Sequence, residues 1–262
     1  MKEETESFPI LHIDDQGASR IENAVVGEFS LTIYLNDQEL ATLLCSPTDL
    51  KYLAAGFLLS EGLIQGKGDI KRILVDADKG AVRVEAHRHD GYSSETSLKR
   101  LITSGGGRGF SVCDVPDAKT RVASEIQISP GEVFALMDEF VQRSELYLAT
   151  GGVHSASLCD STSILFFAED IGRHNAIDKV FGRCALEDIP TTDRVVLTSG
   201  RISSEILLKV AKRNIPVIIS KSAPTNLAVR LAGDLGMTLI GFVRGRSMNA
   251  YTNDWRIVTD GE

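Results

Sequence analysis

Apolar residues along the chain follow two different patterns, one in the first third and another in the second half. Residues 29–45 form two apolar-rich runs around an Asn-Asp pair, which predicts a β-hairpin. Apolar residues recur at helical spacing within 47–63, and residues 69–86 predict a second hairpin that turns near Gly80. These elements together predict a small α+β unit at the amino terminus.

Between about residues 90 and 120, glycine, serine and charged residues replace the regular patterns, apart from a short SLKRLI segment. Such a composition is typical of a connection between domains. A helix is then predicted from Pro130, because Ser129 can cap it and Glu132 completes a capping box. We therefore divide the chain into an amino-terminal α+β domain, 1–120, which ends in a glycine-rich loop, and a second domain, 121–262.

In the second domain, short continuous apolar runs alternate with amphipathic helical segments. Strands are predicted at 163–170, 194–200, 215–220 and 237–243, and helices at 174–182, 203–214 and 226–236. Buried apolar strands that alternate with helices are typical of a largely parallel sheet covered on both faces. The sequence therefore predicts an α/β/α sandwich.

Composition narrows the classes of function. The chain has 262 residues, 43% of them hydrophobic, and a formal net charge of minus 8 at pH 7. A chain of this size can bury a full core, and its negative charge argues against general nucleic-acid binding, which needs a basic face. The sequence has no apolar run of about 18 residues that would span a membrane, and its amino terminus lacks the pattern of a signal peptide. We expect a soluble cytoplasmic protein with no membrane partner.

Polar and cationic side chains follow each of the four predicted strands of the second domain. They are Arg173 and His174 after the first strand, Ser199 and Arg201 after the second, Lys221 and Ser222 after the third, and Arg244 and Arg246 after the fourth. Between Ser199 and Arg201, Gly200 has no side chain, so we expect it to let the backbone approach a ligand. The carboxyl ends of parallel strands meet at one edge of a sheet, where helix amino termini add free N–H donors. This pattern predicts an anion pocket, most simply for phosphate; the alternative is a set of solvated cations and surface ion pairs.

Four cysteines are widely spaced, and no CxxC motif occurs, so the sequence predicts neither a zinc site nor a disulfide framework. Cys45, Cys159 and Cys184 lie in apolar surroundings and are interpreted as small buried residues. Cys113 differs, because it lies in the stretch TSGGGRGFSVCD, beside four glycines and near Arg108. It is the candidate for a reactive thiol.

Several long motifs resemble one known family. They are LATLLCSPTDLKYLAAGFLLSEGLI, TGGVHSASL, EDIGRHNAIDK, LTSGRISSEILLKVAKRNIPVIISKSAPTNLAV and LIGFVRGRSMNAYT. Together they resemble the FdhD/NarQ proteins, the formate dehydrogenase accessory sulfurtransferases, in the right order from about residue 29 to 252.

The resemblance implies a dimeric protein that accepts sulfur from a cysteine desulfurase and passes it to the molybdenum of a bis-guanine-dinucleotide pterin cofactor. The cofactor is then inserted into formate dehydrogenase. It also implies a cytidine deaminase-like fold for the second domain. The segment that contacts the cofactor in the family corresponds here to Phe242, Val243, Arg244, Gly245, Arg246 and Ser247.

The sequence departs from the family pattern at the cysteine motif. The family places one or two cysteines directly after a Thr-Ser pair, whereas here Thr103-Ser104 is followed by Gly106 and Gly109 at those positions. A sulfur relay needs a thiolate, so glycine cannot replace cysteine in it. Either Cys113, a few residues later, carries the persulfide, or this member binds the cofactor as a carrier or chaperone without sulfur-transfer chemistry.

A hydrolytic deaminase is the rival enzyme suggested by the implied fold. Zinc deaminases need an HxE motif and a PCxxC motif, because three side chains hold zinc and the glutamate moves protons. Here His154 is followed by Ser155 and Ala156, and CxxC is absent. The sequence therefore argues against this activity, and we expect no metal site.

Overall fold

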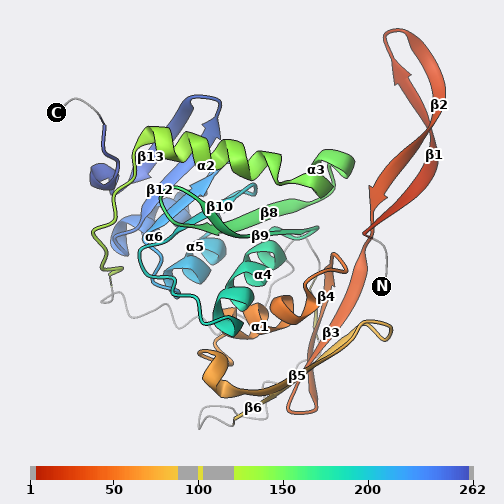
Figure 1. The fold of residues 1–262 in the computed structure, drawn as a ribbon, viewed down its shortest axis with the longest axis horizontal. Helices are drawn as coiled ribbons and strands as arrows, with labels where there is room; N and C mark the ends of the chain where they lie inside the picture. Colours follow the sequence, from red (N-terminus) through yellow and green to blue (C-terminus); the bar gives the residue numbers. More distant parts are fainter. Residues whose placement is uncertain (1–3, 88–99, 103–120, 260–262) are drawn as a thin grey trace.

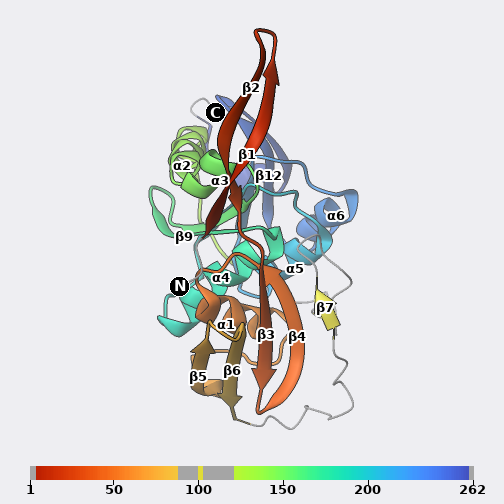
Figure 2. The same ribbon diagram turned by 90° about the vertical axis from the view of Figure 1, so that its right-hand side faces the viewer.

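A computed structural model of the chain describes residues 4–87, 100–102 and 121–259. Two units, each built on its own β-sheet, lie one above the other, and a separate two-stranded hairpin projects from the body (Figures 1 and 2). Among the described residues, no helix has the length and apolar character needed to cross a bilayer. The predicted boundary at residue 120 and the glycine-rich loop lie outside the described residues.

The projecting hairpin pairs β1 (Thr5–Asp14) with β2 (Gly17–Val26). The sequence analysis predicted no element here, because apolar and polar residues do not alternate regularly along either strand. The hairpin exposes apolar side chains, among them Leu11 and Ile13.

The amino-terminal unit is a five-stranded sheet in the order β5-β6-β3-β4-β7. Its strands are β3 (Phe29–Leu35), β4 (Gln38–Cys45), β5 (Ile70–Asp76), β6 (Ala81–Ala86) and β7 (Arg100–Ile102). Both predicted hairpins are confirmed, with left-handed backbone at Asn36 and Asp37 in the first turn and at Gly80 in the second. The predicted helix is α1 (Leu50–Ser60), followed by the 3-10 turn η1 (Lys67–Asp69).

One face of this sheet buries α1, and the other face of α1 packs against the second unit (Figure 1). The contact partner is α4 (Arg173–Leu186). A Cβ on Gly56 would lie 1.8 Å from the Asp178 carbonyl oxygen, and one on Gly182 would lie 1.9 Å from the Tyr52 carbonyl oxygen. The two helices therefore touch backbone to backbone, which fixes how the units sit together.

The second unit is a six-stranded sheet in the order β13-β12-β11-β10-β8-β9. Its strands are β8 (His154–Cys159), β9 (Ile164–Asp170), β10 (Val195–Thr198), β11 (Val217–Ser220), β12 (Thr238–Arg244) and β13 (Ser247–Thr252). The expectation of a largely parallel sheet is wrong. Only β10, β11 and β12 are paired in parallel, whereas β8, β9 and β13 pair antiparallel with their neighbours.

The length of the connections explains two of the antiparallel pairs, β8–β9 and β12–β13. β8 and β9 are joined by a tight turn in which the Asp160 carboxylate accepts hydrogen bonds from the backbone N–H groups of Thr162 and Ser163. β12 and β13 are joined by Gly245 and Arg246 alone. Such short connections can only join antiparallel strands, because a parallel crossover needs a dozen residues or more.

Helices cover both faces of this sheet (Figure 1). They are α2 (Pro130–Gln142) and α3 (Glu145–Thr150) on one face, and α4, α5 (Ser204–Ala211) and α6 (Asn226–Asp234) on the other; η3 (Asp254–Arg256) follows β13. The predicted capping box of α2 is present, with Ser129 and Glu132 each bonded to the other's backbone N–H. Helix–sheet–helix layering is thus confirmed, whereas the likeness to cytidine deaminases stays a prediction.

The carboxyl ends of several strands lie at the same edge of the second sheet. Because β8 is antiparallel to both β9 and β10, the carboxyl ends of β9, β10, β11 and β12 lie at the same edge as the amino end of β8. Asp170 is paired with His154 there, and Thr198 with Ala156. The four predicted strand ends therefore meet at one edge, although the sheet is mixed.

Candidate functional site

A pocket of about 420 Å³ opens at this edge, between the sheet and the ends of α2 and α3. Its lining includes four residues that the sequence analysis singled out, Ser199, Lys221, Ser222 and Arg244, together with His154. They come from the ends of β8, β10, β11 and β12. Phe140, Val141, Ser144 and Tyr147 complete the wall on the helix side.

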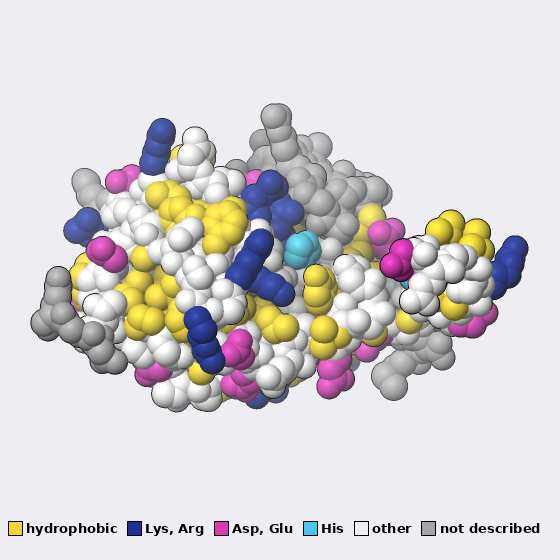
Figure 3. Space-filling view, turned by 90° about the horizontal axis from the view of Figure 1, so that it is seen from above, with side chains coloured by type: hydrophobic (Ala, Val, Ile, Leu, Met, Phe, Trp, Pro, Cys, Tyr) yellow, Lys and Arg dark blue, Asp and Glu magenta, His cyan; other side chains and the backbone are white. Residues whose placement is uncertain are grey.

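The pocket combines two cations with several hydroxyl donors. Lys221 and Arg244 supply the charge, and Ser199 and Ser222 supply hydroxyl groups. Figure 3 shows Lys and Arg side chains gathered around a histidine on one face, beside an exposed hydrophobic area. On a chain with a net charge of minus 8, such a gathering favours a local anion site rather than a broadly basic surface.

His154 contributes a neutral imidazole to the pocket. Burial lowers its pKa, and the nearby charge of Arg173 lowers it further. Its Nδ1 lies 3.4 Å from the Ser199 hydroxyl oxygen, which in turn accepts a 2.9 Å hydrogen bond from the Ser155 backbone N–H. The Ser199 hydroxyl hydrogen is therefore free to be donated to His154 or to a ligand.

Backbone strain orients the end of β12. Phe242 has a φ of 54°, which is unfavourable for a residue with a bulky side chain, and the pairing with β13 is irregular between Gly241 and Arg244. The Phe242 N–H is held by the Ser222 carbonyl oxygen at 3.1 Å, and the Arg244 guanidinium lies 5.7 Å from the Phe242 ring centre. Strain of this kind concentrates at ligand-binding segments, so the irregularity marks this turn as a candidate for contact with a ligand.

The rest of the segment 242–247 is arranged differently. Gly245 has a φ of 56° and forms the turn with Arg246. The Arg246 guanidinium lies over the Phe134 ring at 5.6 Å and pairs with Asp138 at 3.6 Å, so it rests on α2 rather than in the pocket lining. Val243 is buried and Ser247 is exposed.

Arg173, His174 and Arg201 lie at the starts of α4 and α5, next to the pocket but outside its lining. Burial lowers the pKa of Arg173, and Arg201 lowers it further; burial also lowers the pKa of His174 to about 3. Arg173 Nε and His174 Nε2 are buried and have no hydrogen-bond partner in the described part of the chain. At neutral pH the His174 imidazole is uncharged, so its 3.6 Å approach to Glu205 is not an ion pair.

Gly200 separates these residues from the pocket. A Cβ at this position would lie 3.0 Å from Arg173 Cβ and 3.4 Å from His154 Nδ1. The sequence analysis expected this glycine to let a ligand approach the backbone. In the structure, it lets the side chains of Arg173 and His154 lie close to the backbone, and contact with a ligand stays a prediction.

A buried network behind the edge was missed by the sequence analysis. Asp170 accepts hydrogen bonds from the Ser46 N–H at 3.1 Å and the Asn175 amide at 2.8 Å, and it pairs with Lys179 at 2.8 Å. Lys179 also donates to the Glu169 carbonyl oxygen at 2.9 Å. The five- and nine-residue spacings in EDIGRHNAIDK were the available signal, because they place Asn175 and Lys179 on α4 within reach of the preceding strand.

The cysteines separate into two groups. Cys45, Cys159 and Cys184 are buried, as predicted, and burial raises the pKa of each thiol to about 12. Cys113, Gly106 and Gly109 lie outside the described residues. Within the described ranges, no group of three or more His, Cys, Asp or Glu side chains could hold a metal ion.

Comparison with known proteins decides the family. The FdhD/NarQ family pattern matches residues 26–258, which is most of the chain. The chain belongs to the FdhD/NarQ family. The predicted resemblance is thereby confirmed.

Individual relatives agree with this assignment. The chain is 45% identical over 242 residues to the sulfur carrier protein FdhD of Bacillus subtilis (strain 168), covering 91% of this chain and 92% of the relative. It is 42% identical over 253 residues to the protein of the same name from Staphylococcus aureus (strain MRSA252), covering 95% of both. The structure also superimposes on the crystal structure of a protein from Desulfotalea psychrophila that is described as a formate dehydrogenase accessory protein. The TM-score is 0.79 at 27% sequence identity, and the match covers 97% of this chain and 99% of the other.

Proposed function

We propose that this protein is a sulfur carrier for formate dehydrogenase, which binds the molybdenum bis-guanine-dinucleotide pterin cofactor as cargo and receives sulfur from a cysteine desulfurase. Family membership and the chain's similarity to sulfur carrier proteins of two bacteria support the general role. The main observation in favour of cofactor binding is that Lys221, Ser222 and Arg244 line the same pocket at one edge of the sheet.

The chemistry of the pocket suits the phosphate end of such a cargo. Arg244 can bind phosphate oxygens with two parallel N–H groups, Lys221 adds a point charge, and Ser199 and Ser222 add hydroxyl donors. The exposed Phe242 ring and the half-exposed Tyr147 ring offer flat surfaces on which a guanine could stack. The neutral His154 can accept or donate a hydrogen bond without adding charge.

The state of the other three cysteines favours Cys113 for the proposed sulfur step. The sequence contains four cysteines, and the three described ones are buried with thiol pKa values near 12, so they stay protonated at neutral pH. In the proposed step, the Cys113 thiolate attacks the outer sulfur of the desulfurase persulfide, and the desulfurase cysteine leaves as a thiolate. A second thiol then attacks the inner sulfur of the Cys113 persulfide, which forms a mixed disulfide and releases the outer sulfur as hydrosulfide beside the cargo.

Persulfide transfer can be tested directly. After incubation with a cysteine desulfurase and cysteine, Cys113 should gain the mass of one sulfur atom, and reductant should remove it. The Cys113→Ser variant should gain nothing, whereas Cys184→Ala, which removes a buried thiol, should behave like the wild type. Peptide mass spectrometry gives the readout. An unmodified Cys113 together with retained guanine-nucleotide binding would identify this member as a carrier or chaperone without sulfur chemistry.

The binding pocket can be tested with GDP as a probe for the guanine-dinucleotide end. Arg244→Ala should weaken binding by roughly 1.5–3 kcal/mol, because a charged, bidentate contact is lost. Arg246→Ala should weaken it less, because Arg246 rests against Phe134 and Asp138. Arg230→Ala, on the exposed side of α6, is the matched control. Equal affinities for wild type and Arg244→Ala in calorimetry would remove this pocket from the proposal.

Two further parts of the proposal come from the family resemblance. We expect a homodimer and a cytoplasmic location. Light scattering on the purified chain and cell fractionation test these expectations separately.

A further inference from the structure

A second, larger pocket lies at the opposite edge of the second sheet. It has a volume of about 540 Å³ and is lined by residues at or just after the ends of α1 and α5 and by the loop before β10. The lining residues are Leu59, Gly62, Ile64, Gln65, Thr191, Thr192, Lys212, Arg213 and Asn214. This size falls within the range of small-molecule sites, and no part of the proposed sulfur chemistry uses it.

The charge in this pocket is of one sign. Lys212 and Arg213 are its two cations, and none of the described lining residues is acidic. Gln65, Thr191, Thr192 and Asn214 add neutral hydrogen-bonding groups. Glu61 lies within electrostatic reach of Lys212, but burial raises the pKa of Glu61 to about 7, so it offsets the positive charge only in part at neutral pH.

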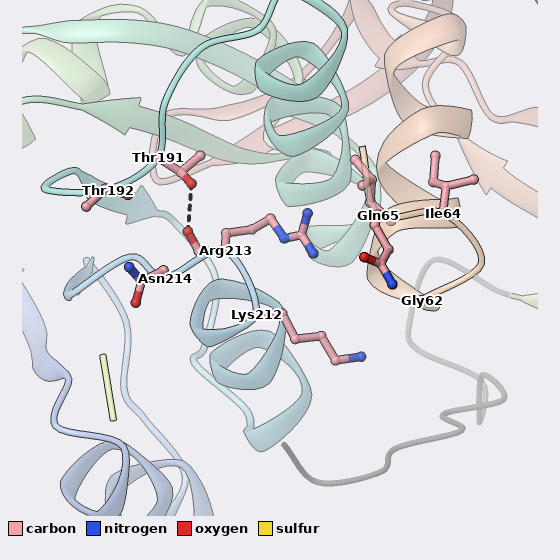
Figure 4. Close-up of a pocket in the computed structure, with 9 residues that line it drawn as sticks. Gly62, Ile64, Gln65, Thr191, Thr192, Lys212, Arg213 and Asn214 are labelled. Carbon is pink, nitrogen blue, oxygen red and sulfur yellow. Dashed lines mark hydrogen bonds between the residues drawn. The ribbon is translucent and has the colours of Figure 1, made fainter. Parts of the chain in front are cut away.

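Arg213 is the central group. Its guanidinium extends into the space between the end of α5 and Gln65 (Figure 4). Burial lowers its pKa, and among the described residues no acceptor or acid pairs with the guanidinium. A guanidinium that has lost part of its water without gaining a partner binds an oxyanion strongly, because its planar N–H groups match two oxygens at once.

The neighbouring groups are fixed in position. The Thr191 hydroxyl donates a 2.6 Å hydrogen bond to the Arg213 carbonyl oxygen, which ties the loop to the end of α5. Lys212 donates a 3.0 Å bond to the Ser60 carbonyl oxygen at the end of α1 and retains two further N–H donors. The pocket is therefore held from both units, with its two cations on a rigid frame.

We propose that this pocket is a second anion site, which takes a small molecule bearing a phosphate group and is separate from the pocket at the other sheet edge. Arg213 binds the phosphate oxygens, Lys212 adds charge, and Thr192 and Asn214 hydrogen-bond the rest of the ligand. The competing explanation is that the two cations only stabilise the carboxyl end of α5, whose carbonyl groups carry partial negative charge.

Calorimetry with pyrophosphate as the probe distinguishes these explanations. The Arg244→Ala background weakens the first pocket, so the remaining binding reports on the second. In that background, Arg213→Gln and Thr192→Glu should each weaken pyrophosphate binding by at least about tenfold. Thr192 is exposed, so Thr192→Glu should leave the fold intact and keep Arg213 in place. Weaker binding by this variant therefore cannot be attributed to a folding defect, as it could be for Arg213→Gln alone. Arg230→Gln, a change at an exposed arginine, should bind as before.

The results for the second pocket can be distinguished from those for the pocket of the proposed function. Pyrophosphate binding that neither variant weakens, or no saturable binding at all, would overturn the second site. GDP binding that Arg213→Gln leaves intact and Arg244→Ala weakens would still support the first pocket. Inorganic phosphate, titrated in parallel, shows whether a single phosphate group suffices.

Discussion

His154 and His174 both lie near Arg173, yet their pKa values depend mainly on burial rather than on that charge. Both imidazoles are neutral at neutral pH, so they contribute hydrogen-bonding groups and no charge. Burial also raises the pKa of Glu61 to about 7 and that of the Cys45 thiol to about 12, so Cys45 stays protonated and unreactive at neutral pH. At the scale of single residues, surroundings decide chemical state more than residue type does.

His174 gives a pH prediction with a definite sign. Its pKa is about 3 in the folded protein and about 6.5 in the unfolded chain, so the unfolded state binds the proton first as the pH falls. The stability that the neutral ring contributes is therefore present above pH 6.5 and is lost as the pH falls towards 3. Compared with His174→Gln, the wild type should lose up to about 1.4 kcal/mol of unfolding free energy per pH unit in this window.

Urea unfolding of both proteins from pH 7.5 to 4.5 measures this difference. The comparison with the variant cancels the carboxylates, which titrate in both chains. A difference that stays constant across the window would show that His174 takes up a proton as readily in the folded protein as in the unfolded chain, so that burial does not lower its pKa.

At the scale of elements, the crossing of α1 and α4 depends on two glycines. Gly56 and Gly182 let the helix backbones touch, and a side chain at either position would overlap a carbonyl oxygen of the other helix. Helical glycine is normally unfavourable by about 1 kcal/mol relative to alanine. Close packing between the helices outweighs this preference.

Alanine substitution should therefore have opposite effects at two helical glycines. Gly182→Ala should destabilise the protein by about 1–3 kcal/mol or more, because α1 and α4 must move apart. Gly233→Ala in α6 should be neutral or stabilising by up to about 1 kcal/mol, because its new Cβ would meet only the Thr252 methyl group, at 3.9 Å. Thermal or urea unfolding measures both. A harmless Gly182→Ala would mean that the helices are not held at this distance.

At the scale of the whole molecule, a polar junction joins the two units behind the candidate site. Asp170 and Lys179 are almost fully buried, and Asp170 also holds the Ser46 N–H of the amino-terminal unit. Asp178 adds a second link, since it accepts hydrogen bonds from Ser60 at 2.5 Å and from Lys209 at 2.5 Å. The sheet edge that carries the pocket is thus anchored to the other unit.

Breaking this junction should cost far more than breaking a surface ion pair. Lys179→Met should destabilise the protein by about 3–5 kcal/mol, because the Asp170 carboxylate stays buried without its counter-charge. Arg143→Met, which breaks the exposed 2.6 Å pair with Glu139, should cost no more than about 1 kcal/mol. Similar losses in urea unfolding for both variants would show that water reaches Asp170.

Local pattern was enough for much of the fold. The turn at Asn36 and Asp37 and the capping box of Ser129 and Glu132 were both predicted and are confirmed. Each depends on residues close in sequence, whose backbone preferences and hydrogen bonds act within a few positions. The sequence analysis did not predict strands β8 and β13 or the β1–β2 hairpin. These strands are recognised by the strands they pair with, rather than by a periodic pattern of their own.

The sequence by itself determined strands β3 to β6 and β9 to β12 with the helices between them, the family, and the fact that a cation or hydroxyl follows each of four strands. Only the tertiary structure decided that Lys221 and Arg244 line the same pocket and that Arg246 lies against α2 instead. It also placed the Arg213 guanidinium at the far edge, where no group in the described part of the chain pairs with it. The physical reason is how far apart in the sequence the interacting residues lie. Turns and caps arise from neighbours along the chain, whereas pocket lining, burial and pKa depend on which distant segments pack together, and sequence spacing does not specify that packing.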